Sequence, residues 1–112
     1  MTAIIGPLET LRQARDAPAV RATYDAAHAS TRRGVLGERN AAMLDEACRA
    51  AGVRRGAYDY RILAWLAGWE PETCVVVAGL IQRAYLAGLG ERADRALATD
   101  MAGDGDDEWN QP

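Results

Sequence analysis

The stretch that most constrains the fold is 61–85, RILAWLAGWEPETCVVVAGLIQRAY, which holds two of the three tryptophans and the longest apolar run. Gly68 and Pro71 divide it, because glycine often follows a helix and proline suits the first helical position. The pattern predicts helix, tight turn, helix. CVVVAGLI also fits a buried β-strand, since β-branched residues favour strands. Pro71, the continuation to Leu86 and the lack of a partner strand favour the helix.

Helical periodicity continues through the rest of the chain. Asp59 is expected to cap the first helix of the stretch 61–85, and a turn is expected at Gly88-Leu89-Gly90. The chain is therefore expected to be all-α, a compact bundle of about five to six short helices with a helix-turn-helix unit at about 58–87. The expected helices span about 7–16, 18–30, 38–51, 59–68, 71–87 and 91–101.

Prolines, glycines and leucines predict local details of this bundle. Pro7 suits the first position of the first helix, with Leu8 and Leu11 facing inward. Gly52 is placed to end the third helix in the left-handed conformation. Gly79 lies inside the helix 71–87 at a cost of about 1 kcal/mol relative to alanine. A close helix–helix contact would explain this glycine.

The charge is divided along the chain, which predicts one folded domain at 1–101 and a disordered acidic tail at 102–112. All 13 basic residues are arginine, and residues 1–99 carry 11 acidic residues, for a net charge of +2. Residues 100–112 carry five further acidic residues and no basic ones, for a net charge of −5. Little in the tail can be buried, so it is expected to stay unfolded.

The chain is expected to be cytoplasmic. Its first residues, MTAIIGPLET, lack the basic region of a signal peptide, and no apolar run approaches the roughly 18–20 residues of a membrane span. Cys48 and Cys74 are expected to be buried thiols in a reducing compartment. No membrane is therefore expected among the partners.

Ala64, Gly68 and Cys74 have the spacing of a helix-turn-helix DNA-binding unit, which this stretch resembles. In such units a small residue lets the helices approach, a glycine makes the turn, and an apolar residue anchors the second helix. The stretch is also similar to small actinomycete proteins that share a WLAGWEPET-type signature. The resemblance implies a regulator that binds double-stranded DNA through a recognition helix starting at Pro71.

The resemblance places Glu72, Thr73 and Val76 near the bases. Glutamates at the start of a recognition helix would repel DNA, so phosphate contacts would depend on arginines elsewhere. Cys48, Gly52 and Tyr58 have the same spacing and form an alternative unit. The arginines expected at the phosphates are Arg32, Arg33, Arg54, Arg55 and Arg61.

The alternative function is a protein-interaction or homo-oligomerisation module with an apolar face on the two helices of the stretch 61–85. No catalytic set, metal-ligand cluster or cofactor-binding motif accompanies the lone His28. The sequence therefore predicts a protein that is not an enzyme and has no metal or cofactor. The residues expected in the interaction face are Trp65, Trp69, Val75, Val76 and Leu80.

Overall fold

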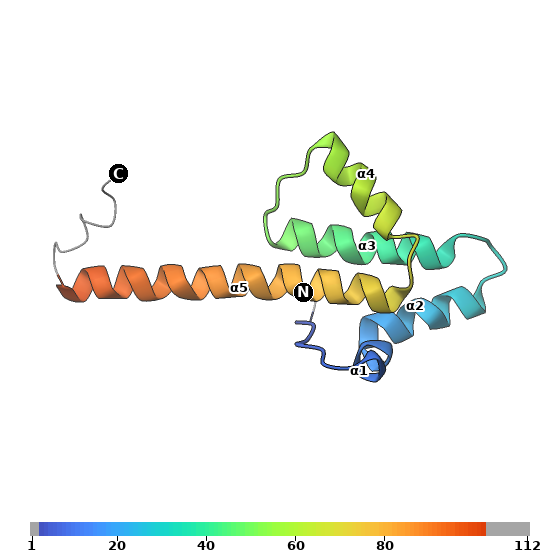
Figure 1. Ribbon diagram of the computed structural model, residues 1–112, viewed down its shortest axis with the longest axis horizontal. Helices are drawn as coiled ribbons and strands as arrows, with labels where there is room; N and C mark the ends of the chain where they lie inside the picture. Colours follow the sequence, from blue (N-terminus) through green and yellow to red (C-terminus); the bar gives the residue numbers. More distant parts are fainter. Residues whose placement is uncertain (1–2, 103–112) are drawn as a thin grey trace.

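The structure is a computed structural model that describes residues 3–102, apart from the side chains of residues 100–102. Every regular element in this part of the chain is an α-helix (Figure 1). The all-α class and the helix-turn-helix order of the last two helices are confirmed, and the strand alternative for CVVVAGLI is wrong. All but the first residue of the expected tail 102–112 lies outside the described residues. The helices are α1 (Leu11–Asp16), α2 (Pro18–Ala29), α3 (Val35–Ala50), α4 (Ala57–Leu66) and α5 (Pro71–Ala102).

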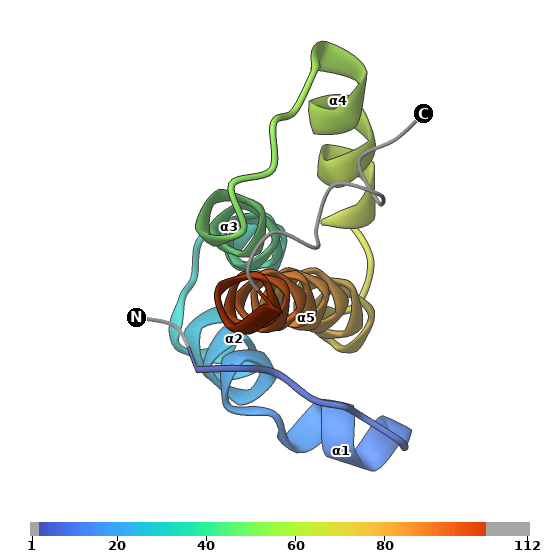
Figure 2. The same cartoon turned by 90° about the vertical axis from the view of Figure 1, so that its left-hand side faces the viewer.

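The N-terminal half of α5 is the centre of the bundle. α3 packs along it and makes the most extensive contact between any two helices of the described chain, while α1 and α2 cover another side (Figures 1 and 2). α4 contacts α3 only slightly and α5 even less. The C-terminal half of α5 extends beyond the end of α3. The core consists mainly of small and aliphatic side chains, among them Val20, Leu44, Ala47, Cys74, Val75 and Ala78.

The expected turn at Gly88-Leu89-Gly90 is wrong, because α5 continues through it to Ala102. A glycine inside a helix costs only about 0.5–1 kcal/mol relative to alanine. The surrounding segment 84–98 is rich in alanine, leucine and arginine, which are strong helix formers. Two glycines are therefore too weak a signal to end this helix, and the two expected helices are one.

The continuous α5 also changes the expectation about membranes. The segment Pro71–Thr99 contains an 18-residue window with a mean hydropathy of 1.4, of which 28% is buried in the protein. By length and composition alone such a helix can cross a membrane. This is weak evidence, since the core helix of a soluble protein meets the same criterion. The sequence-based expectation of no span relied on short apolar runs and on a break that does not exist.

Gly79 lies where the N-terminal segment crosses α5. A Cβ atom at this position would lie 2.8 Å from the carbonyl oxygen of Ile5 and 3.1 Å from its Cγ2 atom. Ile5 is held there by its N–H, which donates to Gln82 Oε1 (2.8 Å), and by its carbonyl, which accepts from Arg83 Nε (3.0 Å). The close contact expected for Gly79 therefore exists, but its partner is an extended segment and not a helix.

The first helix is shorter than expected. It begins at Leu11 after Thr10, whose hydroxyl accepts the N–H of Gln13 at 3.1 Å. Pro7 lies outside the helix, so its expected place in the first turn is wrong. Leu8 packs against the core as expected. Leu11 is 58% exposed, so its expected inward position is also wrong.

We predict opposite effects for two glycine-to-alanine substitutions in α5. Gly79→Ala should lower the free energy of unfolding by about 1–3 kcal/mol, the usual range for overpacking, because the new methyl group meets backbone. Gly88→Ala should raise it by about 0.5–1 kcal/mol, since nothing lies within 4 Å of the added Cβ. Urea denaturation measures both. A destabilising Gly88→Ala would contradict a continuous helix at that position.

Candidate functional site

The turn between α4 and α5 is held against α3 by Asn40. This side chain is fully buried, and its Nδ2 donates to the carbonyl oxygens of Ala67 (3.0 Å) and Trp69 (2.8 Å). The Cys74 thiol donates to the carbonyl of Leu66 at 3.4 Å and is fully buried. Cys74 therefore anchors the second helix as the helix-turn-helix spacing predicted. Asn40 is a site residue that was not predicted, although a polar residue on the apolar stripe of the helix 38–51 is a signal for a buried hydrogen bond.

The start of α4 is held by hydrogen bonds and charges. The N–H of Gly56 donates to Asp59 Oδ2 at 2.8 Å, so Asp59 supports the cap from the third helical position, and its expected role as the N-cap residue is wrong. The guanidinium of Arg55 lies 2.8 Å from Asp45 Oδ1 on α3 and 4.7 Å from the centre of the Tyr60 ring. These contacts connect the α3–α4 loop to α3.

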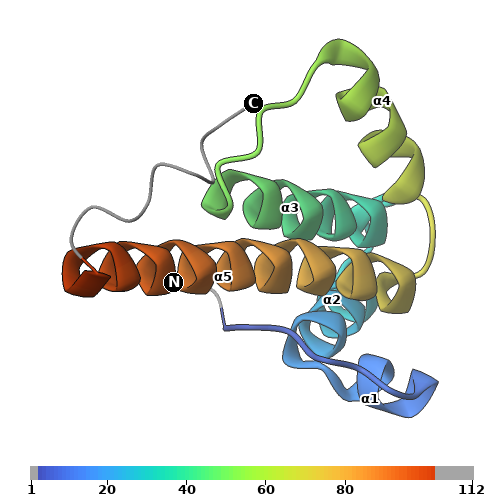
Figure 3. The same ribbon diagram turned by 60° about the vertical axis from the view of Figure 1, so that its left-hand side comes forward.

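Between these two attachments α4 buries very little. None of its residues is fully buried, and its inner side consists of the half-buried Leu63 and Leu66, followed by the buried Ala67 in the turn. Ala64, expected at a close approach of the two helices, is exposed, so that expectation is wrong. Figure 3 shows α4 standing away from α5. α4 is therefore positioned by its ends and by a small apolar inner face, Leu63 and Leu66, which packs against the core.

The larger side chains of α4 lie on its outer side. Tyr58 is 70% exposed, Ile62 42% and Trp65 62%. These residues and Arg61 follow the i, i+3, i+4, i+7 spacing of one helix face, and together they line a surface hollow of about 520 Å³. Trp69 extends this face, since its ring meets that of Trp65 edge-on with centroids 5.7 Å apart. We call these five residues the α4 surface.

Two arginines lie on or near this apolar face. Arg61 lines the hollow, and Arg54 is exposed in the loop that leads into α4. Neither guanidinium forms an ion pair with a side chain of the described part of the chain. Asp59, which is also exposed on α4, accepts a backbone hydrogen bond and keeps its negative charge. The α4 surface is therefore apolar with arginine at its edge.

The expected interaction face is only partly brought together. Trp65 and Trp69 are neighbours, but Val75 is fully buried in the core and contributes nothing to an exposed surface. Val76 lines a different hollow beside α1, and α1 and α4 lie on opposite sides of α5 (Figure 2). Leu80 is 55% exposed on α5. The apolar surface that the structure assembles is therefore centred on α4, where Tyr58 and Ile62 replace the valines.

The chain matches no protein-family model, no curated protein and no solved structure. The geometry of its own residues therefore carries the functional proposal.

The five arginines expected at DNA phosphates do not form one surface. Arg32 and Arg33 precede α3 and Arg54 and Arg55 follow it, and a helix of 16 residues is about 24 Å long. Arg32 forms two hydrogen bonds with Glu38, of 2.6 and 3.0 Å. The side chain of Arg55 is only 7% exposed and is paired with Asp45. The exposed arginines near α4 are therefore Arg54 and Arg61.

Glu72, expected to face DNA bases, belongs to a buried network instead. Its carboxylate accepts a hydrogen bond from the Tyr24 hydroxyl (2.6 Å) and one from Arg15 Nε (3.2 Å), and its side chain is 7% exposed. These contacts fasten α1 and α2 to the first turn of α5. Of the residues expected at the bases, Thr73 is exposed and Val76 is partly exposed.

The network shifts the pKa values of two of its members. Burial raises the pKa of Glu72, but hydrogen bonds from Tyr24, from its own backbone and from Arg15 together outweigh burial and hold the pKa below its ordinary value of 4.5. The hydrogen bond to Glu72, followed by burial, raises the pKa of Tyr24 to about 12. Both shifts favour a charged glutamate beside a neutral tyrosine, which is the arrangement that the hydrogen bond requires.

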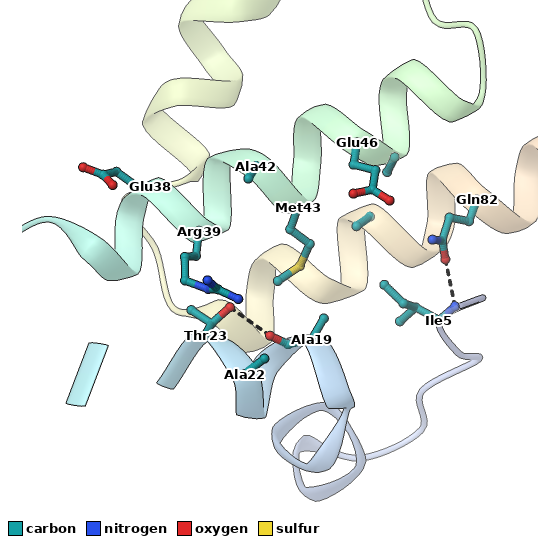
Figure 4. Close-up of a pocket in the computed structure, with 12 residues that line it drawn as sticks. Ile5, Ala19, Ala22, Thr23, Glu38, Arg39, Ala42, Met43, Glu46 and Gln82 are labelled. Atoms are coloured by element: carbon teal, nitrogen blue, oxygen red, sulfur yellow. Dashed lines mark hydrogen bonds between the residues drawn. The ribbon is translucent and has the colours of Figure 1, made fainter. Parts of the chain in front are cut away.

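A second hollow, of about 470 Å³, lies among α2, α3, α5 and the N-terminal segment (Figure 4). Some of its polar groups are paired within the protein, whereas the lining Arg39 and Glu46 form no ion pair with a described side chain. The Thr23 hydroxyl donates to the carbonyl of Ala19, and Gln82 bonds Ile5 on one side and Ala3 on the other. Among residues 3–99, no three His, Cys, Asp or Glu side chains lie close enough together to hold a metal ion.

We predict that Glu72→Gln destabilises the protein in a pH-dependent way. Because the folded-state pKa of Glu72 is lowered, its stabilisation is complete above pH 4.5 and is lost as the pH falls below that value. At pH 7 the variant should lose about 1–3 kcal/mol of unfolding free energy, and the difference from wild type should shrink toward pH 3. Urea denaturation at pH 7, 5 and 3 measures this.

The control for this prediction is Glu9→Gln, since Glu9 is exposed and its carboxylate accepts no hydrogen bond from the described side chains. Its effect on the free energy of unfolding should be within about 0.5 kcal/mol at each pH. A loss for Glu72→Gln that is equal at pH 7 and pH 3 would contradict the role given to the ionised carboxylate.

Proposed function

We propose that this protein is a non-enzymatic protein-interaction module whose α4 surface binds an acidic segment carrying an aromatic or large aliphatic side chain. The observation that carries this proposal is the orientation of α4. Its inner side offers two half-buried leucines and an alanine, while Tyr58, Ile62 and Trp65 face solvent. Large apolar side chains grouped on an exposed face are typical of interface centres, where tryptophan and tyrosine dominate the binding energy.

Charge supports an acidic partner. Arg61 lines the hollow and Arg54 lies in the adjoining loop, and neither is neutralised by an ion pair within residues 3–99. An interface with an apolar centre and a charged rim takes its affinity from the centre and its selectivity and association rate from the rim. A partner segment meets both requirements if its bulky side chain enters the hollow and its neighbouring carboxylates contact the arginines.

The geometry favours a protein partner over duplex DNA. A recognition helix presents its first turn to the bases, whereas the first turn of α5 contains the buried Pro71, Glu72 and Cys74. The arginines that precede and follow α3 lie at opposite ends of that helix, and α5 has no arginine before Arg83. A DNA-binding regulator of the helix-turn-helix type is therefore not the function proposed, and the binding experiment below tests it with a DNA duplex.

We predict that the protein binds a labelled ten-residue peptide of aspartates and glutamates around one tryptophan, and that Trp65→Ala weakens this binding. Loss of an interface tryptophan typically costs about 2 kcal/mol or more, which is roughly a thirtyfold increase in Kd. Raising the salt concentration should weaken binding further, because Arg61 is exposed. Fluorescence anisotropy measures Kd at two salt concentrations.

Two controls accompany this measurement. Leu97→Ala removes a side chain that is 60% exposed on α5, far from α4, and should leave Kd unchanged. A peptide with alanine in place of tryptophan should bind at least about tenfold more weakly, a difference of about 1.4 kcal/mol. Two outcomes would contradict the proposal: no binding to the folded protein, or tighter binding to a labelled DNA duplex than to the peptide.

A further inference from the structure

The sequence of this chain contains a segment with the chemistry that the α4 surface requires. Residues 104–109 read Asp-Gly-Asp-Asp-Glu-Trp, four carboxylates followed by a tryptophan. We infer that this acidic segment of one molecule binds the α4 surface of a second molecule, so that the chain associates head to tail. This inference rests on the proposed function, because it names the partner of the same surface.

The two partners are complementary in both charge and shape. The segment carries a charge of −4 and no basic residue, whereas Arg61 lines the hollow and Arg54 is exposed in the loop before α4. The hollow of about 520 Å³ is lined by Tyr58, Ile62 and Trp65, and it can accept an aromatic ring in the edge-on geometry that Trp65 and Trp69 already share. The adjacent carboxylates would then lie near Arg61.

The length of α5 separates the segment from the α4 surface of its own chain. α5 has 32 residues and is therefore about 48 Å long. Trp65 lies near the start of α5, since its ring touches that of Trp69, which precedes Pro71 by two residues. Residues 103–109 span at most about 25 Å when fully extended. Trp109 therefore cannot reach the hollow of its own chain, and a second copy must supply the segment.

The contact joins two different surfaces and is therefore heterologous. Such contacts generate open chains of molecules, or rings if the geometry closes. Each molecule in the chain would use its α4 surface for one neighbour and its acidic segment for the other. If every molecule lacks a functional α4 surface, or every molecule lacks the acidic segment, assembly should stop. If one molecule lacks only the surface and a second lacks only the segment, the two should still form one contact.

This logic gives an experiment with two complementary variants of the full-length protein. The surface variant carries Arg61→Glu and Trp65→Ala, both at exposed positions. The segment variant neutralises the carboxylates and removes the tryptophan. Circular dichroism and urea denaturation verify that both variants fold like the wild type. The substitutions in the segment variant are Asp104→Asn, Asp106→Asn, Asp107→Asn, Glu108→Gln and Trp109→Ala.

We predict that wild-type protein increases in average mass with concentration, while each variant alone remains a monomer of 12.1 kDa. An equimolar mixture of the two variants should form a 1:1 dimer and nothing larger, because one intact surface meets one intact segment. Sedimentation equilibrium between about 1 and 100 μM, which brackets a Kd in the micromolar range, measures these masses. Raising the salt concentration should dissociate the dimer.

Three outcomes would overturn the inference: a monomeric wild type over this range, a surface variant that still associates by itself, or a mixture that remains monomeric. The proposed function is separable from this result. If the acidic tryptophan peptide binds the α4 surface but the wild type remains a monomer, the surface has an external partner and the head-to-tail contact is wrong. If the peptide does not bind either, both proposals are wrong.

Discussion

Asn40 donates both of its amide hydrogens to the turn that joins α4 and α5, and these two hydrogen bonds set the direction in which α4 leaves the bundle. Without them the buried carbonyl of Ala67 would lose its partner, which costs about 1–3 kcal/mol, and the partly buried carbonyl of Trp69 would lose its bond to α3. The Oδ1 atom of Asn40 is itself buried and accepts no hydrogen bond from the described residues, so this arrangement carries a cost. The position of α4 thus depends on polar contacts at its ends and on Leu63 and Leu66, which pack against the core, while Tyr58, Ile62 and Trp65 face outward.

α5 joins two regions with different roles. Its first half is fixed by the carboxylate of Glu72, which holds α1 and α2, and by the absence of a side chain at Gly79, which admits Ile5. Its second half extends beyond α3 with no helix packed against it in the described chain. The extension matters for the proposed assembly because it carries the acidic segment beyond the reach of its own α4 surface. Because α5 keeps the acidic segment away from the α4 surface of the same molecule, both remain free to bind other molecules.

Much of the fold could be predicted from the sequence, because helical periodicity, proline positions and the glycine at 52 are local signals. Gly52 has a φ of 70° and ends α3 as expected. The continuation through Gly88 could not be predicted, since two glycines and a leucine are compatible with a turn or with a weak helix. The site was harder still. Both Val75 and Tyr58 are apolar residues on helices, and only the packing of α3 against α5 places Val75 in the core and leaves Tyr58 in solvent.

Amide hydrogen exchange is the most direct test of two claims about α4. The first is that few contacts protect it in the free protein, and the second is that a bound partner covers its outer side. In the segment variant at low concentration, the amides of residues 60–66 should exchange faster than those of α3 and of the first half of α5, since few contacts protect α4. Saturation with the acidic tryptophan peptide should slow exchange in α4 and leave the second half of α5 unchanged. Protection of α4 equal to that of α3 in the free protein, with no change on adding the peptide, would contradict this arrangement.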